Sequence, residues 1–307
     1  MLAAHIAGSR HSLRPPLTHI AGSRHSLRPP LRMQFNTDNS LNSVGFLSPD
    51  MEPIIADLRK IHATWFVFAE DVNRTGQRIL REFQPSGTVT VRDVVGIALL
   101  MRTLSNFQGT ILMAQRGMAA EAGTLAPCCF ENAFFLGTLR KEEDDFLAEM
   151  QMADRYGVKA AARWLVRIPD RLEHAPRRAK QRLEGLINEI KQQIPGFEPP
   201  KFEALANRAG VADAYVHYAT LSREAAHPSA QSLDRHFVRG RGATPLQEMR
   251  WGAYAGDPDE IGLTLNMACL AMLEVCESTS DMLANTGAAS EVKAHRSVYD
   301  KLNGGKL

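Results

Sequence analysis

One short stretch of the chain gathers side chains that could carry out acid–base chemistry. Residues 218–233 read YATLSREAAHPSAQSL and contain a tyrosine, an arginine, a histidine and three serines. On a helix, Tyr218 and Ser222 share one face, and Arg223 and His227 share another, because each pair is four residues apart. A histidine titrates near neutral pH and a tyrosine donates a hydrogen bond, so the stretch is a candidate site for catalysis or ligand binding.

Ordinary helix-end chemistry explains the same residues. Pro228 disfavours the helical conformation at His227, so we expect the helix to end there. A histidine in the last turn of a helix can donate to the free carbonyl groups, and its cation is favoured by the helix dipole. The stretch alone therefore leaves a catalytic and a capping interpretation open.

Two carboxylates on an otherwise apolar helix are the natural partners for this stretch. Glu121 and Glu131 lie in the helix expected at residues 119–140, and Glu131 stands among cysteines and phenylalanines. A carboxylate in such surroundings needs a polar partner, because burial of an unpaired charge is costly. We expect His227 to lie near Glu131 or Glu121, with Tyr218 or Ser222 facing the same junction. The candidate catalytic residues are Glu131, His227 and Arg223, and the candidate binding residues are Glu121, Tyr218 and Ser222.

Other catalytic or binding motifs are missing from the sequence. It contains no glycine-rich phosphate loop, no GxSxG, no HExxH and no pair of Glu-x-x-His units in the core helices. We therefore predict no metal and no cofactor. The four cysteines are spaced for neither a zinc site nor a disulfide framework and lie in apolar helical stretches. We interpret them as small core residues in a reducing compartment.

Helical periodicity runs through most of the chain. Apolar residues recur every three or four positions in long segments, and Pro127 and Gly157 predict a kink and a break. The last of these segments is almost entirely apolar in its first half, which is typical of a central core helix. The pattern predicts an all-α fold, a multi-helix bundle. The long helices are expected at about 53–83, 91–117, 119–140, 141–168, 170–193 and 258–284.

The two ends of the chain are expected to lie outside this bundle. Residues 5–18 and 19–32 are identical at thirteen of fourteen positions, unlike a structural repeat, which keeps only its core positions. We interpret residues 1–32 as a duplicated, disordered tail, upstream of a normal start at Met33. The predicted organisation continues with an N-terminal helical segment at 33–90, the main bundle at 91–285 and a flexible C-terminal tail at 286–307.

Charge argues against a general attraction to nucleic acid. Five arginines and no acidic residue lie in 1–32, so the remaining chain has 31 basic and 34 acidic residues, a net charge of −3. No apolar run reaches the roughly 20 residues that a membrane span needs. We therefore expect a soluble, cytoplasmic protein without a membrane or nucleic-acid partner. The partner is then an unidentified protein or small molecule, and a homodimer stays open.

The two motifs together resemble a family of bacterial helical proteins of unknown function. The resemblance covers about 90–285 and combines the acidic helix of Glu121 and Glu131 with a later Tyr…Leu-Ser…His-Pro-Ser element. This chain departs from the family at residues 127–129, where Pro-Cys-Cys stands in place of the usual arginine. The later element comprises Tyr218, Leu221, Ser222, His227, Pro228 and Ser229. The resemblance implies an all-helical fold and no established activity.

A weaker resemblance links Arg223 and His227 to HEPN-type helical ribonucleases. Those enzymes cleave RNA without a metal, using an arginine and a histidine with four to six residues between them, and here only three intervene. We predict a binding or accessory module whose Glu, Tyr, Ser and His cluster has an unassigned role. The alternatives are a HEPN-like metal-independent ribonuclease, and a small-molecule hydrolase or transferase that uses Glu131 and His227. The sequence does not decide whether the protein is an enzyme.

Overall fold

The computed structural model describes most of the chain between residues 44 and 304. The described residues are 44–83, 88–167, 177–223, 232–233, 237–238, 248–249, 259–283 and 286–304. The predicted disordered tail at residues 1–32 and the predicted position of His227 lie outside these ranges.

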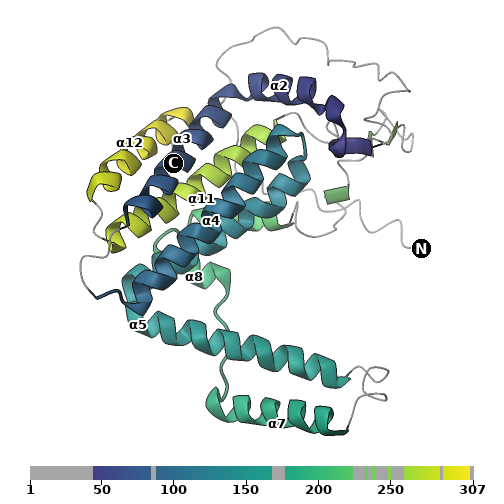
Figure 1. The fold of residues 1–307 in the computed structure, drawn as a ribbon, viewed down its shortest axis with the longest axis vertical. Coiled ribbons are helices and arrows are strands. Elements are labelled where there is room, and N and C mark those ends of the chain that lie inside the picture. Colours follow the sequence, from purple (N-terminus) through teal and green to yellow (C-terminus); the bar gives the residue numbers. More distant parts are fainter. Residues whose placement is uncertain are drawn as a thin grey trace, which may run out of the picture.

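The described chain is almost entirely helical, which confirms the all-α bundle (Figure 1). Two-residue strands, β1 (Phe237–Val238) and β2 (Glu248–Met249), pair antiparallel. Two 3₁₀ turns, η1 (Gly45–Leu47) and η2 (Pro49–Met51), precede the first long helix. The α-helices are α2 (Glu52–Ile61), α3 (Ala63–Glu82), α4 (Val91–Gln115), α5 (Ala119–Arg167), α7 (Arg177–Gln193), α8 (Phe202–Ala209), α9 (Ala214–Leu221), α11 (Glu260–Met282) and α12 (Thr286–Leu302).

Helix α11 is the central element of the core, as its apolar sequence predicts. It packs against α3, α4, α5 and α12, and Leu265, Cys269, Met272 and Cys276 are fully buried. The helix is long and apolar enough to cross a membrane, but 78% of its apolar window is buried inside the protein. That burial is typical of a core helix. The cytoplasmic location stays a prediction.

The break between α2 and α3 and the shape of α5 differ from the sequence-based expectations. The single helix expected at 53–83 is divided into α2 and α3 by His62, whose backbone angles are not helical. Helix α5 runs through Pro127 and Gly157, and leaves helical geometry at Glu143, where φ is +47°. The backbone of α5 stays helical at the buried Pro127, and the break expected near Gly157 is wrong because the helix continues through that residue.

Beyond Glu143, α5 leaves the bundle and pairs with α7 to form a two-helix arm (Figure 1). Ala162 of α5 and Ile187 and Ile190 of α7 are buried in this arm. Where the bundle meets the arm, the Arg208 guanidinium of α8 binds Glu142 and Glu149, one on each side of the kink, at 2.6 and 2.5 Å. This double ion pair fixes the angle at which the arm leaves the bundle.

The flexible C-terminal tail predicted for 286–307 is wrong for residues 286–304. Thr286–Leu302 form helix α12, which packs on α11 and α3 and buries Ala288, Val292 and Tyr299. Arg296 on this helix donates to both Glu274 and Glu277 of α11. One alanine, one valine and one tyrosine are a weak apolar pattern for seventeen residues, so tertiary contacts stabilise this helix.

Candidate functional site

Glu131 and Tyr218 meet at the junction of α5 and α9. The Tyr218 hydroxyl donates to Oε1 of Glu131 across 3.3 Å, so Tyr218 faces the Glu131 junction as expected, while the expected approach of His227 stays a prediction. Ser222, at the end of α9, lies close enough to Tyr218 to oppose part of the rise in its pKa, so these three candidates lie together. Both Glu131 and Tyr218 are partly buried, so a group on a partner or ligand could reach them from one side.

Aromatic rings hold Tyr218 in position. Its ring packs against Phe134 of α5, Phe202 of α8 and Tyr215 of its own helix, with centroid distances of 5.8, 5.2 and 5.7 Å. Such pairs stabilise beyond the area that they bury, and they restrict the tyrosine to one orientation. The hydroxyl is therefore aimed at Glu131 by the packing of three helices.

The pKa values of the acidic groups at this junction are raised, so these groups lose their protons less readily than usual. Burial raises the pKa of Glu131, although the Tyr218 hydrogen bond and the charge of Arg102 on α4 partly oppose the shift. Burial and the neighbouring Glu131 carboxylate raise the pKa of Tyr218 to about 12. Burial, followed by the charge of Glu131, raises the pKa of the Cys128 thiol. Tyr218 is thus a hydrogen-bond donor at neutral pH, and Cys128 is a poor nucleophile.

The other candidate residues are not part of this contact. Glu121 is exposed on the first turn of α5, ten residues and roughly 15 Å from Glu131 along the helix. Arg223 is exposed just beyond α9, and His227 lies outside the described residues. His217 stacks on Phe130 at 6.5 Å, and burial lowers its pKa, so this histidine is neutral at pH 7.

Residues 93–243 match a family of unknown function, DUF5677. The matched region starts in the first turn of α4 and contains the whole Glu131–Tyr218–Ser222 cluster. The resemblance to an uncharacterised helical family is therefore confirmed. No curated protein and no solved structure shows significant similarity to the chain. Helices α3, α11 and α12, which complete the core, lie outside the DUF5677 match.

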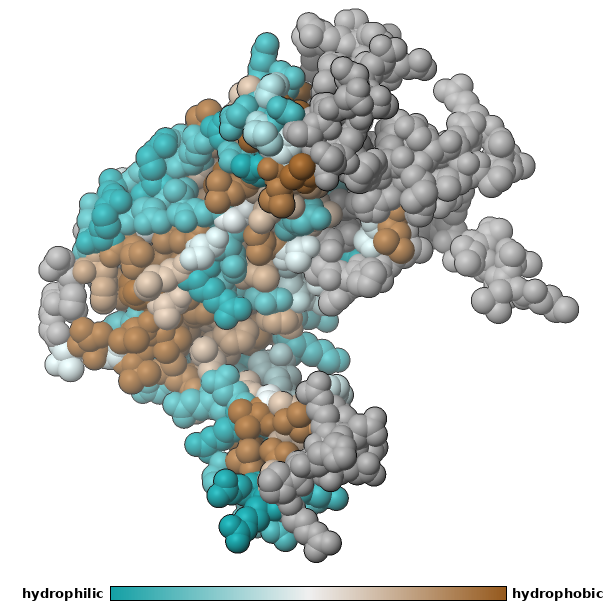
Figure 2. Space-filling model, turned by 45° about the vertical axis from the view of Figure 1, so that its right-hand side comes forward, coloured by the Kyte–Doolittle hydropathy of each residue, from teal (hydrophilic) through white to brown (hydrophobic). Residues whose placement is uncertain are grey.

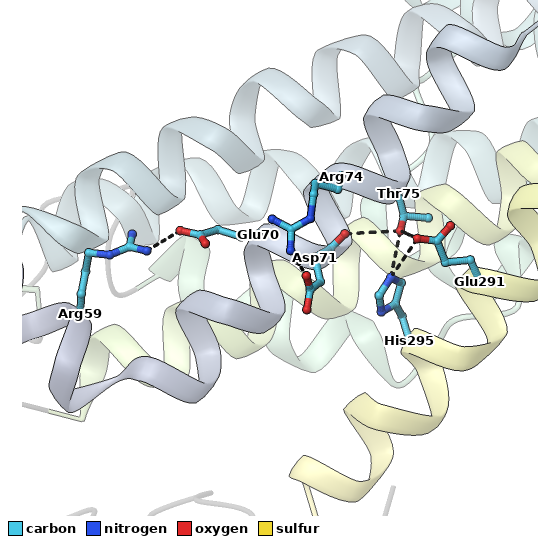
Figure 3. A network of polar contacts seen from close by, with 7 residues as sticks. All are labelled: Arg59, Glu70, Asp71, Arg74, Thr75, Glu291 and His295. Carbon is cyan, nitrogen blue, oxygen red and sulfur yellow. Dashed lines mark hydrogen bonds and ion pairs between the residues drawn. The ribbon is translucent and has the colours of Figure 1, made fainter.

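A second polar cluster, on α3 and α12, was missed by the sequence analysis (Figure 3). The Thr75 hydroxyl donates to Oε1 of Glu291 at 2.7 Å and lies 2.9 Å from Nε2 of His295. Arg78 forms an ion pair with the same glutamate. The signal was present in the spacing, because Glu291 and His295 are four residues apart on one face of a helix. It was overlooked because residues 286–307 were assigned to a tail.

The four cysteines behave largely as the sequence predicts. Cys129, Cys269 and Cys276 are fully buried, whereas Cys128 is partly exposed. Burial raises the pKa of each of the three buried thiols. Within the described ranges no group of three or more His, Cys, Asp and Glu side chains has the arrangement of a metal site.

Proposed function

We propose that the protein is a binding module whose ligand contacts the Glu131–Tyr218–Ser222 cluster. The observation that carries the proposal is the 3.3 Å hydrogen bond between Tyr218 and Glu131, held at a half-buried junction by aromatic rings from α5, α8 and α9. A carboxylate, a phenol and a hydroxyl in fixed positions can accept and donate hydrogen bonds to one ligand. Binding sites commonly combine a few such polar groups with aromatic walls.

Variants of the cluster are expected to lose the ligand. Wild-type protein, Glu131→Gln and Tyr218→Phe would be purified at full length from the native cell, and bound species would be measured by native mass spectrometry. We expect at least a tenfold loss of the bound species in both variants, because each removes a polar contact whose partner is then unpaired. Tyr156→Phe is the matched control, since Tyr156 lies on the arm and its ring packs on Phe197.

Two outcomes would contradict this proposal. Equal occupancy in wild type and both cluster variants would leave the hydrogen bond as a purely structural link between α5 and α9. Cleavage of RNA by the wild-type protein, abolished in Arg223→Ala, would favour the ribonuclease instead.

The exposed face of α4 supports pairing with a second copy of the chain. Val91, Val94, Met101 and Leu112 are 65, 57, 52 and 56% exposed, which is unusual for four large apolar residues of one helix. Their successive spacings of three, seven and eleven residues keep all four near one seam of the helix, as in helix–helix packing. Figure 2 shows a broad apolar area on the bundle between hydrophilic surfaces.

The face is self-complementary under a two-fold axis. If two copies of α4 run antiparallel about residues 101 and 102, Val91 lies opposite Leu112, and the small exposed Ala98 lies opposite the small exposed Ser105. An isologous interface requires this matching of one patch with itself. In this register Arg102 lies next to the two-fold axis, opposite Met101 of the second copy, and its charge also acts on Glu131.

A charge placed in this face is expected to separate the copies. The wild-type protein should sediment as a dimer at micromolar concentration, and Leu112→Glu should sediment as a monomer, because its carboxylate would lie opposite the apolar Val91 and a buried unpaired carboxylate opposes association. Val67→Glu on α3, which replaces a residue that is 56% exposed, should leave the dimer intact. A wild-type protein that is monomeric at all concentrations tested by analytical ultracentrifugation would rule out this pairing.

A further inference from the structure

Helices α3 and α12 enclose a polar pocket that lies outside the DUF5677 match. Its volume is about 330 Å³, which is within the range of small-molecule sites. Figure 3 shows Asp71, Arg74 and Thr75 on α3 beside Glu291 and His295 on α12. All of its lining residues are polar or charged: Asp71, Asn73, Arg74, Gln77, Arg78, Arg81, Glu291 and His295.

Three arginines give this pocket an excess of positive charge. Arg74, Arg78 and Arg81 follow one another at four and three residues, so α3 presents all three on one side. Only two carboxylates, Asp71 and Glu291, line the pocket. Each of them is already used, since Asp71 pairs with Arg74 and Glu291 pairs with Arg78. The third arginine therefore sets the net charge of the pocket to +1.

Two hydrogen-bond donors of the lining remain available. Among the residues that the structure describes, neither the exposed Arg81 guanidinium nor the Gln77 side-chain amide has a partner. The Nε of Arg78 makes no hydrogen bond within the described chain, although it lies 3.8 Å from Oε1 of Glu82. Unused guanidinium and amide donors around one cavity favour a ligand that is rich in acceptor oxygens.

The base of the pocket is rigid. Thr75 is 1% exposed and ties α3 to α12 through its contacts with Glu291 and His295. The His295 ring also packs edge-on against Phe68 at 6.0 Å. Arg78 is thus supported by a fixed carboxylate, Glu291, which lowers the entropic cost of ordering this arginine around a ligand.

We propose that this pocket binds a phosphate group. The planar guanidinium fork matches phosphate oxygens, and hydrogen bonds between charged groups are about twice as strong as neutral ones. A dianionic phosphate offsets the excess charge, whereas the three arginines repel a metal cation. The volume exceeds that of a bare phosphate ion, so a small phosphate monoester fits the pocket as well.

Calorimetric titration of the full-length protein tests this inference with two probes, inorganic phosphate and methyl phosphate, at matched ionic strength. We expect saturable binding of at least one probe at one site per chain. Tighter binding of methyl phosphate identifies a monoester site, and equal or tighter binding of inorganic phosphate identifies a free-phosphate site. Arg81→Gln should weaken binding about tenfold or more, a loss equivalent to about 1.4 kcal/mol.

Two further variants make the result specific. Gln77→Met removes the free amide with little change in volume and should weaken binding severalfold without altering the thermal unfolding of the protein. Arg163→Gln replaces an exposed arginine of the arm and should bind as the wild type does. Non-saturable heats, or equal affinity in Arg81→Gln and Arg163→Gln, would overturn the inference. None of these variants changes the Glu131–Tyr218–Ser222 cluster. The phosphate site and the proposed ligand site at that cluster can therefore be contradicted independently.

Discussion

Replacing Arg296 with alanine is expected to lower the free energy of unfolding by about 3 kcal/mol, because it leaves two carboxylates without their cation. The Nη2 atom of Arg296 lies 2.7 Å from Glu274 and 3.0 Å from Glu277, and its Nε lies 3.0 Å from Glu277. The three side chains are only 22, 19 and 32% exposed. Burial raises the pKa of Glu274, and the Arg296 charge opposes this shift. Urea denaturation at pH 7 measures the loss.

The surface ion pair between Arg140 and Asp281 provides the control for this variant. The Asp281 side chain is 59% exposed, so Arg140→Ala should cost less than about 1 kcal/mol. Adding Glu274→Gln to Arg296→Ala should recover roughly 1 kcal/mol, because it removes the more buried of the two stranded charges. Equal losses in Arg296→Ala and Arg140→Ala would show that this ion-pair network does not hold α12 on the core.

The helical core could be predicted because its signal is local and strong. The apolar run of α11 predicts burial on all sides, and Leu265, Cys269 and Met272 are indeed fully buried. The capping box of Thr90 and Asp93 begins α4 within a residue of the expected start. In both helices, the residues themselves determine the periodicity and the end signals, so no tertiary information is needed.

The features that were missed depend on contacts between distant segments. The boundary expected between the helices at 119–140 and 141–168 lies close to the kink at Glu143, but the sequence does not indicate that Arg208 binds glutamates on both sides of it. Helix α12 has few large apolar residues and is held by Arg296 and Tyr299, whose partners lie on α11. Sequence periodicity predicts which face of a helix is buried, and it does not identify the residues on other helices that contact that face.

The candidate site was predicted in part, for a physical reason. Glu131 and Tyr218 are polar residues on helices that are apolar enough to be buried, and buried polar groups need partners, so their contact could be inferred. Their catalytic or binding role stays a prediction, as does any role of Arg223 or Glu121. The α3–α12 pocket could not be inferred, because it requires two helices about 220 positions apart in sequence to cross, as Thr75 and His295 do.

Replacing Gly137 of α5 with alanine is expected to lower the free energy of unfolding by about 2 kcal/mol. A Cβ atom at Gly137 would lie 2.8 Å from the Cβ of Ala209, closer than real side chains approach, and 3.4 Å from the Ala209 Cα. Helix α8 cannot move away easily, because the adjacent Arg208 is tied to Glu142 and Glu149. Overpacking at this point would therefore strain the backbone contact between α5 and α8.

Gly157 is the matched control, since it lies in the same helix with no heavy atom within 4 Å of an added Cβ. Gly157→Ala should stabilise the protein by about 0.5–1 kcal/mol, because alanine loses less conformational freedom in a helix than glycine. Ala209→Gly combined with Gly137→Ala should recover part of the loss, since it removes the atom that the new methyl group meets. Thermal unfolding of the wild type, Gly137→Ala, Ala209→Gly and the double variant forms a double-mutant cycle, which measures the coupling between residues 137 and 209. Destabilisation of similar size in Gly137→Ala and Gly157→Ala would mean that the α5–α8 approach is looser than the 2.8 Å contact implies.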